Sequence, residues 1–248
     1  MRLVCLNIWG GIMLKEFMGF VAGMKATADI FCFQEVFDSE PGNVSLIKGM
    51  DKAKPDIYKD LVTELQGFNG YVAIPQKNQR GLATFVKKGI DVKKVEEFYI
   101  YGKKDGMIGN DPQTIAANML HTAIERNGKT YDVYNLHGLW LPGEKYDDPK
   151  TIEQSRNIEK FVGGSSGSKI ICGDFNLALD TESVRIVERM GFDNLVRKNG
   201  IKSTRPDFFS FPQKYADYTF VSKGIEVRGF TVLSSVVSDH LPMLLDFE

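Results

Sequence analysis

The chain has 248 residues, of which 43% are hydrophobic and 25% charged, a balance typical of a soluble globular protein. Its formal net charge of -1 and sequence pI near 6.3 exclude a global basic signature, so any attraction to a polyanion must come from local patches or a bound cation. No apolar stretch approaches the roughly 20 residues that span a bilayer, and the start of the chain has the pattern of a strand and not of a signal peptide. We therefore expect a cytoplasmic protein with a single domain over residues 1–248 and a monomer as the default state.

Apolar residues in the first half of the chain recur with strand spacing in some segments and with helix spacing in others. Residues 3–9 are nearly continuous apolar, as expected for a strand covered on both faces, whereas residues 13–24 have helical spacing. The other predicted strands of this half are residues 30–33, 71–74, 82–86 and 92–100. A second helix is predicted over residues 56–65, after a loop rich in Pro, Gly and Lys at about residues 38–55.

The second half begins with the strongest short hairpin signal of the chain. Asn127 and Gly128 separate two strand-like segments, residues 115–125 and 131–136. The Gly-Lys-Thr sequence that starts at Gly128 looks like part of a phosphate-binding loop, but such a loop needs a glycine five residues earlier, where Ala123 stands. We therefore interpret this sequence as a hairpin turn.

Further helices and strands follow to the end of the chain. Helices are predicted over residues 149–162 and 182–190, and strands over residues 169–172, 217–221, 227–233 and 243–247. Residues 163–168 are a Gly- and Ser-rich connection, and a long irregular segment precedes residue 217. Because the helices are separated by both isolated strands and hairpins, we expect mixed sheets and not an all-parallel doubly wound sheet.

The three cysteines, Cys5, Cys32 and Cys172, each lie inside an apolar strand-like run. Their spacing differs from the paired spacing that zinc sites use. Buried free thiols are the expected state.

Polar side chains interrupt the apolar strands near their ends. They are Asn7, Gln34, Glu35, Asn135, His137, Asp174, Asn176, Asp239 and His240. Five such strand ends could converge at one edge of a sheet core, where loops carry function. Taken singly, Glu35 and Asp174 could be surface turn residues, and Asn7 could be a buried amide bonded to neighbouring backbone. His121 lies in mid-strand with no adjacent motif, so a structural or exposed role is expected.

If these strand ends converge, Glu35, Asp174 and Asp239 repel one another, and a hard divalent cation would relieve the repulsion. Oxygen ligands with few imidazoles favour Mg²⁺ or Mn²⁺ over zinc. Such a cation neutralises a phosphate oxygen and stabilises charge on the leaving group, while a carboxylate or imidazole moves the proton of an attacking water. The residue types therefore predict phosphate ester hydrolysis.

Six blocks of these and neighbouring residues occur in order along nearly the whole chain. They are Asn7 with Trp9 and Gly10, Phe-Gln-Glu-Val at 33–36, Asn135 with His137, Gly-Asp-Phe-Asn at 173–176, Asp217 with Tyr218, and Ser-Asp-His-Leu-Pro at 238–242. In this order they resemble the endonuclease/exonuclease/phosphatase superfamily, which includes DNase I, exonuclease III and neutral sphingomyelinase. The resemblance implies a four-layer α/β/β/α sandwich of the α+β class, with two mixed, mainly antiparallel sheets packed face to face.

The resemblance also implies which residues hold a metal ion. Glu35 would be the principal ligand, with Asn7 close by and Asp239 assisting. The implied cofactor is Mg²⁺ or Mn²⁺.

The implied catalytic residues are His137, Asp174, Asn176, Asp217 and His240. Asp174 and Asn176 would orient or deprotonate the attacking water and hold the phosphate. His240 would contact the scissile phosphate as an acid/base group, with its ring held in one tautomer by Asp217. His137 matches a position that is histidine in the DNase I-like and sphingomyelinase-like branches and tyrosine in the AP endonucleases. With Trp9, it favours the DNase I, sphingomyelinase or phosphatase branches.

Substrate contacts are predicted in part from the irregular segment that precedes residue 217. There Lys198, Lys202, Arg205 and Lys214 are interleaved with Phe208, Phe209 and Phe211. Basic groups with aromatics could grip a phosphate backbone and stack a base, but they could equally face a lipid headgroup, and the phenylalanines could pack as core. The candidate substrate-binding residues are Asn135, Trp140, Arg205 and Phe209. Two loops, with Lys48, Lys52 and Lys54 in one and Lys103 and Lys104 in the other, could form a rim or simply carry solvated charge.

The predicted function is a metal-dependent phosphoester hydrolase, specifically a phosphodiesterase or nuclease that uses direct water attack. Nucleic acid is the leading substrate class, and a phospholipid or sugar-phosphate ester is the alternative. A third possibility is a binding scaffold that keeps the fold without its chemistry. The intact set of charged residues argues against a scaffold, because a retired site has no physical reason to keep buried like charges together.

Overall fold

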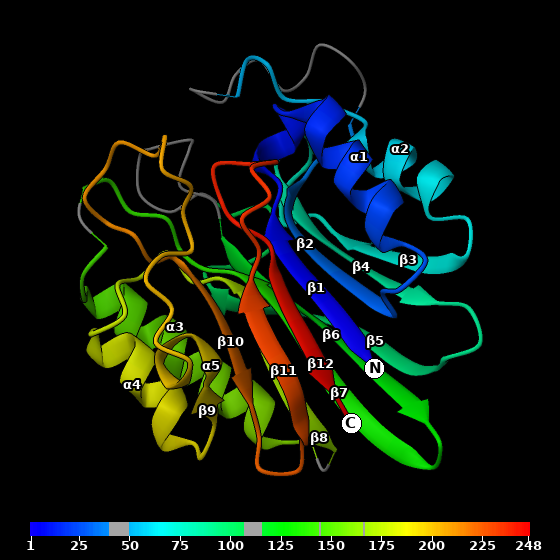
Figure 1. The fold of residues 1–248 in the computed structure, drawn as a ribbon. Helices are drawn as coiled ribbons and strands as arrows, with labels where there is room; N and C mark the ends of the chain where they lie inside the picture. Colours follow the sequence, from blue (N-terminus) through cyan, green and yellow to red (C-terminus); the bar gives the residue numbers. More distant parts are fainter. Residues whose placement is uncertain (40–49, 107–115, 144, 166) are drawn as a thin grey trace.

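The computed structural model describes residues 1–39, 50–106, 116–143, 145–165 and 167–248 (Figure 1). Its helices are α1 (Leu14–Met24), α2 (Ile57–Glu64), α3 (Pro149–Gly163), α4 (Glu182–Arg189) and α5 (Leu195–Lys198), with a 3-10 turn, η1, at Trp9–Gly11. Within the described segments, no helix combines the length and the apolar character needed to cross a membrane.

Six strands form the first sheet, in the order β11-β12-β1-β2-β4-β3. They are β1 (Arg2–Asn7), β2 (Ile30–Val36), β3 (Phe68–Ala73), β4 (Gly81–Lys87), β11 (Val227–Val232) and β12 (Met243–Phe247). β1 and β2 run parallel, and the other neighbours run antiparallel. The sheet is therefore mixed and mainly antiparallel.

The second sheet has the same character, in the order β5-β6-β7-β8-β10-β9. Its strands are β5 (Asp91–Tyr101), β6 (Ala117–Arg126), β7 (Lys129–His137), β8 (Ser168–Asp174), β9 (Asp193–Asn194) and β10 (Asp217–Val221). β7 and β8 form the parallel pair of this sheet. Each sheet thus contains one parallel pair of strands, and in each sheet this pair lies away from the edges.

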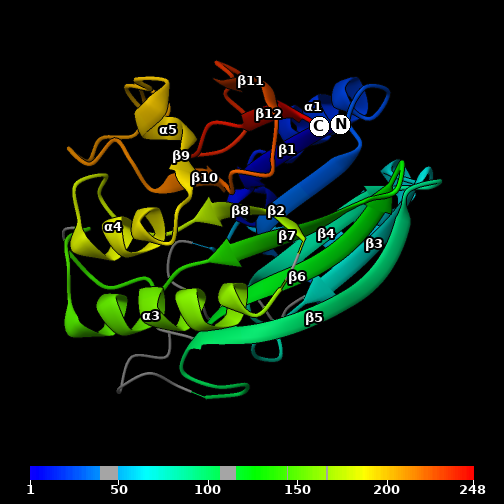
Figure 2. The ribbon, with the colours of Figure 1, turned by 90° about the horizontal axis from the view of Figure 1, so that it is seen from below.

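The two sheets pack face to face with helices outside. Figure 1 shows α1 and α2 beside the first sheet and α3 and α4 on the other side of the molecule, and Figure 2 shows the sheets between them. The predicted four-layer sandwich is confirmed.

Alternation of side chains along the strands builds two apolar layers. Leu3 and Cys5 of β1 belong to the core between the sheets. Val4 and Leu6, on the opposite face of the strand, belong to the core under α1 and α2. Phe17 of α1 enters that second core and packs edge-on against Phe33 of β2, with the ring centres 5.4 Å apart. All three cysteines are buried and free, as predicted.

Local sequence explains the sharpest connections. Asn127 and Gly128, with φ of 53° and 73°, both adopt the left-handed conformation that a two-residue hairpin turn requires, so the predicted hairpin is confirmed. Its first predicted residue, 115, lies outside the described residues. α3 begins with a capping box, because the Asp148 side chain accepts from a first-turn N–H and Thr151 closes the box in return.

Several predicted boundaries differ from the structure by up to three residues, and two short elements were not predicted. β1 ends at Asn7, before residue 9, because Trp9 and Gly10 have φ of 50° and 60°, which a strand cannot contain. The irregular segment before residue 217 contains the short elements β9 and α5, where Asn194 caps the helix by accepting from the backbone N–H of Arg197. Elements this short show no recognisable period. Residues 40–49 of the predicted first loop lie outside the described residues.

Candidate active site

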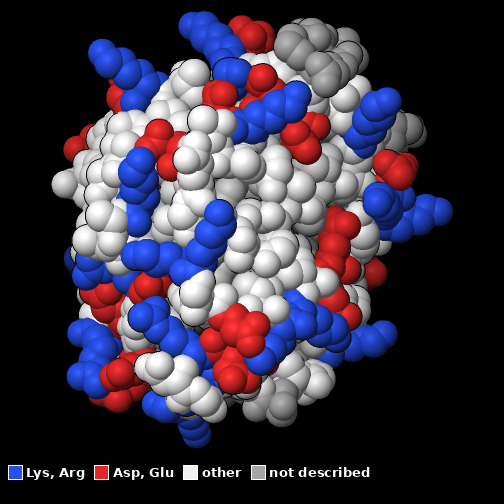
Figure 3. All heavy atoms as spheres, turned by 90° about the vertical axis from the view of Figure 1, so that its right-hand side faces the viewer, with Lys and Arg blue, Asp and Glu red and all other residues white. Residues whose placement is uncertain are grey.

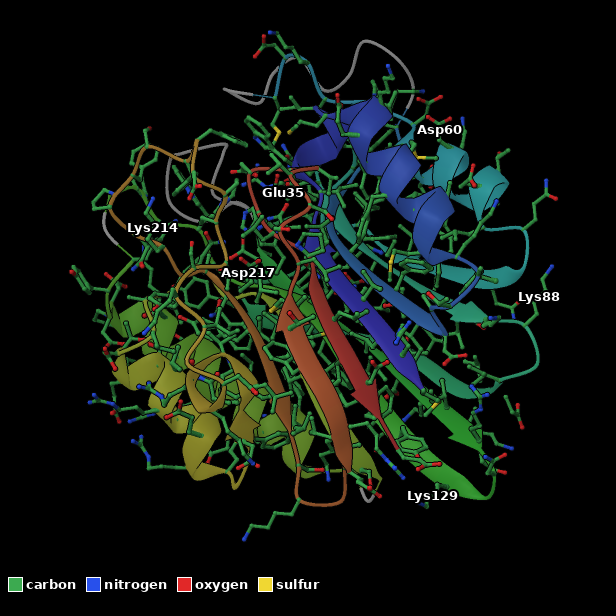
Figure 4. All side chains as sticks on the ribbon, viewed as in Figure 1. Glu35, Asp60, Lys88, Lys129, Lys214 and Asp217 are labelled. Atoms are coloured by element: carbon green, nitrogen blue, oxygen red, sulfur yellow. The ribbon has the colours of Figure 1, made fainter. Side chains whose placement is uncertain are left out.

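Strand register brings predicted site residues to one edge of the sandwich. Asn7 ends β1 in the first sheet. In the second sheet, Asp174 at the end of β8 lies between His137 of β7 and Asp217 at the start of β10. Figure 4 shows Glu35 and Asp217 near this edge of the two sheets. The predicted convergence of strand ends is therefore present.

A β-bulge turns Glu35 into the site. The pairing of β2 with β4 shifts between Gln34 and Val36, which leaves Glu35 as the extra residue, with a left-handed φ of 59°. Its side chain is 12% exposed, and its Oε2 atom is buried without a hydrogen-bond partner among the described residues. Burial, with Asp239 nearby, raises the pKa of Glu35 against the opposing effect of Arg80.

A tight turn holds Asp174. Gly173 has a φ of 143°, and a Cβ there would lie 2.0 Å from the carbonyl oxygen of Leu136, so this position requires glycine. The backbone N–H of Asn176, itself at a φ of 56°, donates to Asp174 Oδ1 at 2.7 Å. Asn7 Nδ2 donates to Asp174 Oδ2 at 3.0 Å across the two sheets. The carboxylate is therefore fixed from both sides.

His240 and Asp217 form a buried pair. His240 Nδ1 lies 2.8 Å from both carboxylate oxygens of Asp217, which fixes Nδ1 as the donor. Its Nε2 lies 3.5 Å from Asp174 Oδ2 and 3.8 Å from Asp239 Oδ1. Burial and Arg205 lower the pKa of His240, but the three carboxylates outweigh them and the net shift is upward. Burial likewise opposes ionisation of Asp174, yet His240 and other positive groups lower its pKa to about 2.

His137 lies between the two sheets' carboxylates. Its Nε2 is 3.7 Å from Glu35 Oε1 and 3.8 Å from Asp174 Oδ2. Burial, reinforced by the positive charge of Arg80, lowers the pKa of His137 to about 3 although Asp174 opposes the shift. His137 is therefore neutral at pH 7.

Two basic side chains that the sequence analysis missed face the same centre. Arg80, just before β4, has a side chain that is 9% exposed, and its Nε lies 3.4 Å from Glu35 Oε1. Lys145 Nζ donates to Asn176 Oδ1 at 3.0 Å and sits 5.3 Å from the ring centre of Trp140. Burial lowers the pKa of Lys145 to about 8. A single basic residue outside any motif gives no sequence signal, so neither could be found from the sequence.

Arg205 joins the irregular segment to the site. Its Nη1 donates to Asp239 Oδ2 at 2.8 Å and to the Asp239 carbonyl oxygen at 3.1 Å. Its guanidinium also stacks over Phe209, 4.3 Å from the ring centre. Arg205 is thus committed to holding Asp239 and Phe209 in place.

A pocket of about 710 Å³ opens over these groups. Its lining includes Glu35, Asp174, Asn176, Asp239 and His240, together with the three basic residues Arg80, Lys145 and Arg205. Its aromatic lining residues are Trp9, Trp140, Tyr146, Phe209, Phe211 and Tyr215. The pocket therefore joins a charged centre to an aromatic surround.

Some predicted residues lie elsewhere. Asn135 is fully buried, where it accepts from Gln34 Nε2 at 2.6 Å and donates to the carbonyl oxygens of Phe33 and Ala83, so it links the two sheets away from the pocket. The rim lysines are absent from the lining, namely Lys52, Lys54, Lys103 and Lys104. Lys48 lies outside the described residues. His121 has a structural place, since it is buried with Nε2 2.6 Å from Asp132.

The phenylalanines of the irregular segment are not core residues. Phe208 and Phe211 are 52% and 66% exposed, so the core interpretation is wrong for both. Phe211 lines the pocket beside Phe209, with the ring centres 5.4 Å apart. Lys214 belongs to the same segment and stabilises it by donating a hydrogen bond to the Phe209 carbonyl oxygen.

A model of the endonuclease/exonuclease/phosphatase family matches residues 5–240. The chain belongs to this family. Members of the family are mostly phosphoester hydrolases. No match to a curated protein sequence was found.

Solved structures of the family have the same fold. A mannosyl-6-phosphatase of Bacteroides thetaiotaomicron is 16% identical with a TM-score of 0.75, over 100% of this chain and 99% of that one. TDP2 of D. rerio, in complex with a single-strand DNA product, is 12% identical with a TM-score of 0.72, over 100% and 98%. The human Nocturnin catalytic domain with a bound sulfate is 16% identical with a TM-score of 0.63, over 100% and 94%. At these identities the likeness concerns the fold alone.

The donor set fits the divalent cation on which this family generally depends. Asp174, Asp217 and His240 place ligand atoms within 4.8 Å of one another, but Asp217 and His240 already satisfy each other. The unpartnered Oε2 of Glu35 has no such use, and a buried carboxylate oxygen without a donor is costly. Asn7 Oδ1 accepts one backbone N–H and keeps acceptor capacity. Oxygen donors of this kind suit Mg²⁺ or Mn²⁺.

Proposed function

We propose that the chain hydrolyses phosphate esters by direct attack of water on phosphorus, with Mg²⁺ or Mn²⁺ held by Glu35, Asn7 and Asp239. The observation that carries the proposal is the buried, unpartnered Oε2 of Glu35 beside the Asp174 carboxylate and the His240–Asp217 pair. The cation would neutralise a phosphate oxygen and stabilise charge on the leaving group. A spent site would not retain so many buried charges.

The chain's own residues divide the remaining work. Asp174 is ionised and fixed in place, and with a pKa of about 2 it is a weak base, so it serves chiefly to orient the attacking water. Asn176 lines the pocket, donates to Asp174 through its backbone N–H, and holds Lys145 through its side-chain Oδ1. His240, whose pKa the three surrounding carboxylates raise, donates from Nε2 to a phosphate oxygen while Asp217 holds Nδ1. His137 stays neutral and shields the centre on the Glu35 side.

Nucleic acid remains the leading substrate class, as a single-stranded end or a nucleotide. The aromatic lining offers faces on which a base can stack, and Trp140, Arg205 and Phe209 are the proposed contacts. The face of the molecule in Figure 3 mixes charges of both signs, so a long basic track does not run over it. The bounded pocket of about 710 Å³ also supports a second candidate, a sugar-phosphate ester of similar size.

A substrate panel tests the proposal. We expect turnover of at least one ester among single-stranded DNA, RNA, nucleotides, sugar phosphates, phospholipids and nitrophenyl phosphates with Mg²⁺ or Mn²⁺. Chelation should abolish it, and added cation should restore it. Glu35→Gln should lower kcat/KM by about 100-fold or more, because it removes a charged ligand, and should weaken Mn²⁺ binding measured by calorimetry. Glu64→Gln, whose carboxylate pairs with Lys25 on the surface, is the matched control. Activity that survives both chelation and Glu35→Gln contradicts the proposal.

A further inference from the structure

Arg80 is a buried cation that has no hydrogen-bond acceptor among the described residues. Its side chain is 9% exposed and lines the pocket, and its guanidinium forms no hydrogen bond within the described parts of the chain. The nearest carboxylate oxygen, Glu35 Oε1, lies 3.4 Å from Nε without hydrogen-bond geometry. Nε is the guanidinium nitrogen that is buried without a hydrogen-bond partner among the described residues, and a buried donor left unpaired is costly. The Arg80 guanidinium can therefore donate hydrogen bonds to a bound anion.

The fold fixes Arg80 in this position. Across the bulge, Val36 of β2 pairs with Gly81, the residue that follows Arg80, so Glu35 and Arg80 are placed side by side. Gly81 is itself confined, because a Cβ there would lie 2.2 Å from the carbonyl oxygen of Ala73. The same backbone irregularity that turns Glu35 into the site thus also sets the place of the guanidinium.

Lys145 reaches the pocket beside Asn176. Its Nζ donates one hydrogen bond, to Asn176 Oδ1 at 3.0 Å, and an ammonium has further donors to offer. Arg205, the third basic residue of the pocket, is already bound to Asp239 through two contacts. Arg205 therefore lies on the Asp239 side of the pocket, whereas Arg80 and Lys145 lie beside Glu35 and Asn176 and both have donors left for a ligand.

The charge of this pair distinguishes two classes of ester. A phosphodiester carries a single negative charge on its two non-bridging oxygens, whereas a terminal phosphate approaches two charges at pH 7 and offers three terminal oxygens. His240 and a bound cation would satisfy the two non-bridging oxygens that a diester presents. A terminal phosphate has one more oxygen and one more charge, which the Arg80 fork and the Lys145 ammonium match.

We propose that Arg80 and Lys145 form an anion subsite that selects a doubly charged terminal phosphate, so that the preferred substrates are phosphomonoesters. This inference rests on the proposed phosphoester hydrolysis and narrows it. It differs from the sequence-based expectation of a phosphodiesterase. The organic part of the ester, nucleoside or sugar, is left to the aromatic lining.

The test compares two esters with one leaving group, p-nitrophenyl phosphate and bis-p-nitrophenyl phosphate, so that intrinsic reactivity cancels between variants. Arg80→Gln should lower kcat/KM for the monoester by about 30- to 100-fold, which lies within the range for a lost charged hydrogen bond, and should lower that for the diester by less than about fivefold. Lys145→Gln, which can still donate to Asn176, should act in the same direction. Arg126→Gln, at a surface pair with Asp29, is the matched control.

Phosphate binding gives a readout independent of turnover. Calorimetry with inorganic phosphate and Mg²⁺ should show at least about tenfold weaker binding in Arg80→Gln than in wild type. Arg80→Lys should recover part of the affinity, because it keeps the charge and loses the fork. Urea midpoints measured for each variant identify any that fail to fold. If the Arg80 variants do not fold, the same monoester and diester comparison with Lys145→Gln tests the subsite.

The outcomes separate this inference from the proposed function. If Arg80→Gln lowers both esters equally, or leaves phosphate affinity unchanged, the subsite is refuted while metal-dependent hydrolysis stands. A greater loss on the diester would indicate that Arg80 holds a neighbouring phosphate, which also overturns the monoester preference. If wild type hydrolyses neither ester nor any other of the panel, yet binds phosphate through Arg80, the proposed function fails and the subsite stands.

Discussion

Replacing Asp217 with asparagine should reduce turnover and leave substrate binding nearly unchanged. Asp217 is 2% exposed and absent from the pocket lining, and both of its oxygens lie 2.8 Å from His240 Nδ1. A hydrogen bond to a charged group contributes about 1.5–3 kcal/mol, and about 1.4 kcal/mol corresponds to a tenfold change in rate. Because the asparagine amide can also donate to Nδ1 and impose the wrong tautomer, we expect the upper end, a fall in kcat of about 100-fold. KM should stay within about threefold.

A second buried pair provides the matched control. Asp132 accepts from His121 at 2.6 Å and is 4% exposed, so Asp132→Asn removes the same kind of interaction away from the pocket. Both variants should lose about 1–3 kcal/mol of unfolding free energy, measured by urea denaturation, but Asp132→Asn should keep kcat within about twofold. Steady-state kinetics on the best ester of the panel gives kcat and KM for both. Asp217 does not position His240 for turnover if Asp217→Asn keeps kcat within about threefold, or if Asp132→Asn loses as much.

Three further predictions concern the pocket, the pH dependence and the turn. Phe209→Ala should raise KM about 5- to 30-fold through lost stacking, with little change in kcat, whereas exposed Phe208→Ala, outside the lining, should leave both unchanged. Because the pKa of His137 is lowered from 6.5 to about 3, the unfolded chain binds a proton in this range that the native state does not. Stability should therefore fall as the pH drops below about 6.5, and His137→Asn should flatten that part of the urea midpoint curve measured without divalent cations. Gly173→Ala should cost at least about 2 kcal/mol in urea denaturation, whereas Gly163→Ala, with open space around its Cβ position, should cost far less.

The sequence predicted the elements well where hydrophobic period and turn chemistry agree. The strands predicted at 217–221 and 243–247 have the observed bounds, and the hairpin turn at Asn127 and Gly128 has the left-handed backbone that those residues favour. The ordered motif blocks predicted the family and the four-layer sandwich. The short elements β9 and α5 were missed because a few residues cannot display a period.

The sequence did not show which of the site residues lie close together in space. The predicted carboxylates and histidines do meet, but Asn135, which matches the same motif set, serves to join the sheets. Arg80 and Lys145 belong to the pocket because a strand start and a loop, neither of them part of a motif block, end beside Glu35 and Asn176. No pattern within either segment indicates this, since the contact exists only after both sheets have packed.

The amino-acid sequence by itself determined the family and the scaffold, because the residue types at strand ends and the apolar periods are local properties. Tertiary structure decided how those groups act together. It placed Glu35 at a bulge with its Oε2 lacking a hydrogen-bond partner among the described residues, fixed the His240 ring with Asp217, and set Arg80 against the same centre. Burial in that packed edge then shifted the pKa values of His137, Asp174 and Lys145, which depend on distances and desolvation that no linear pattern contains.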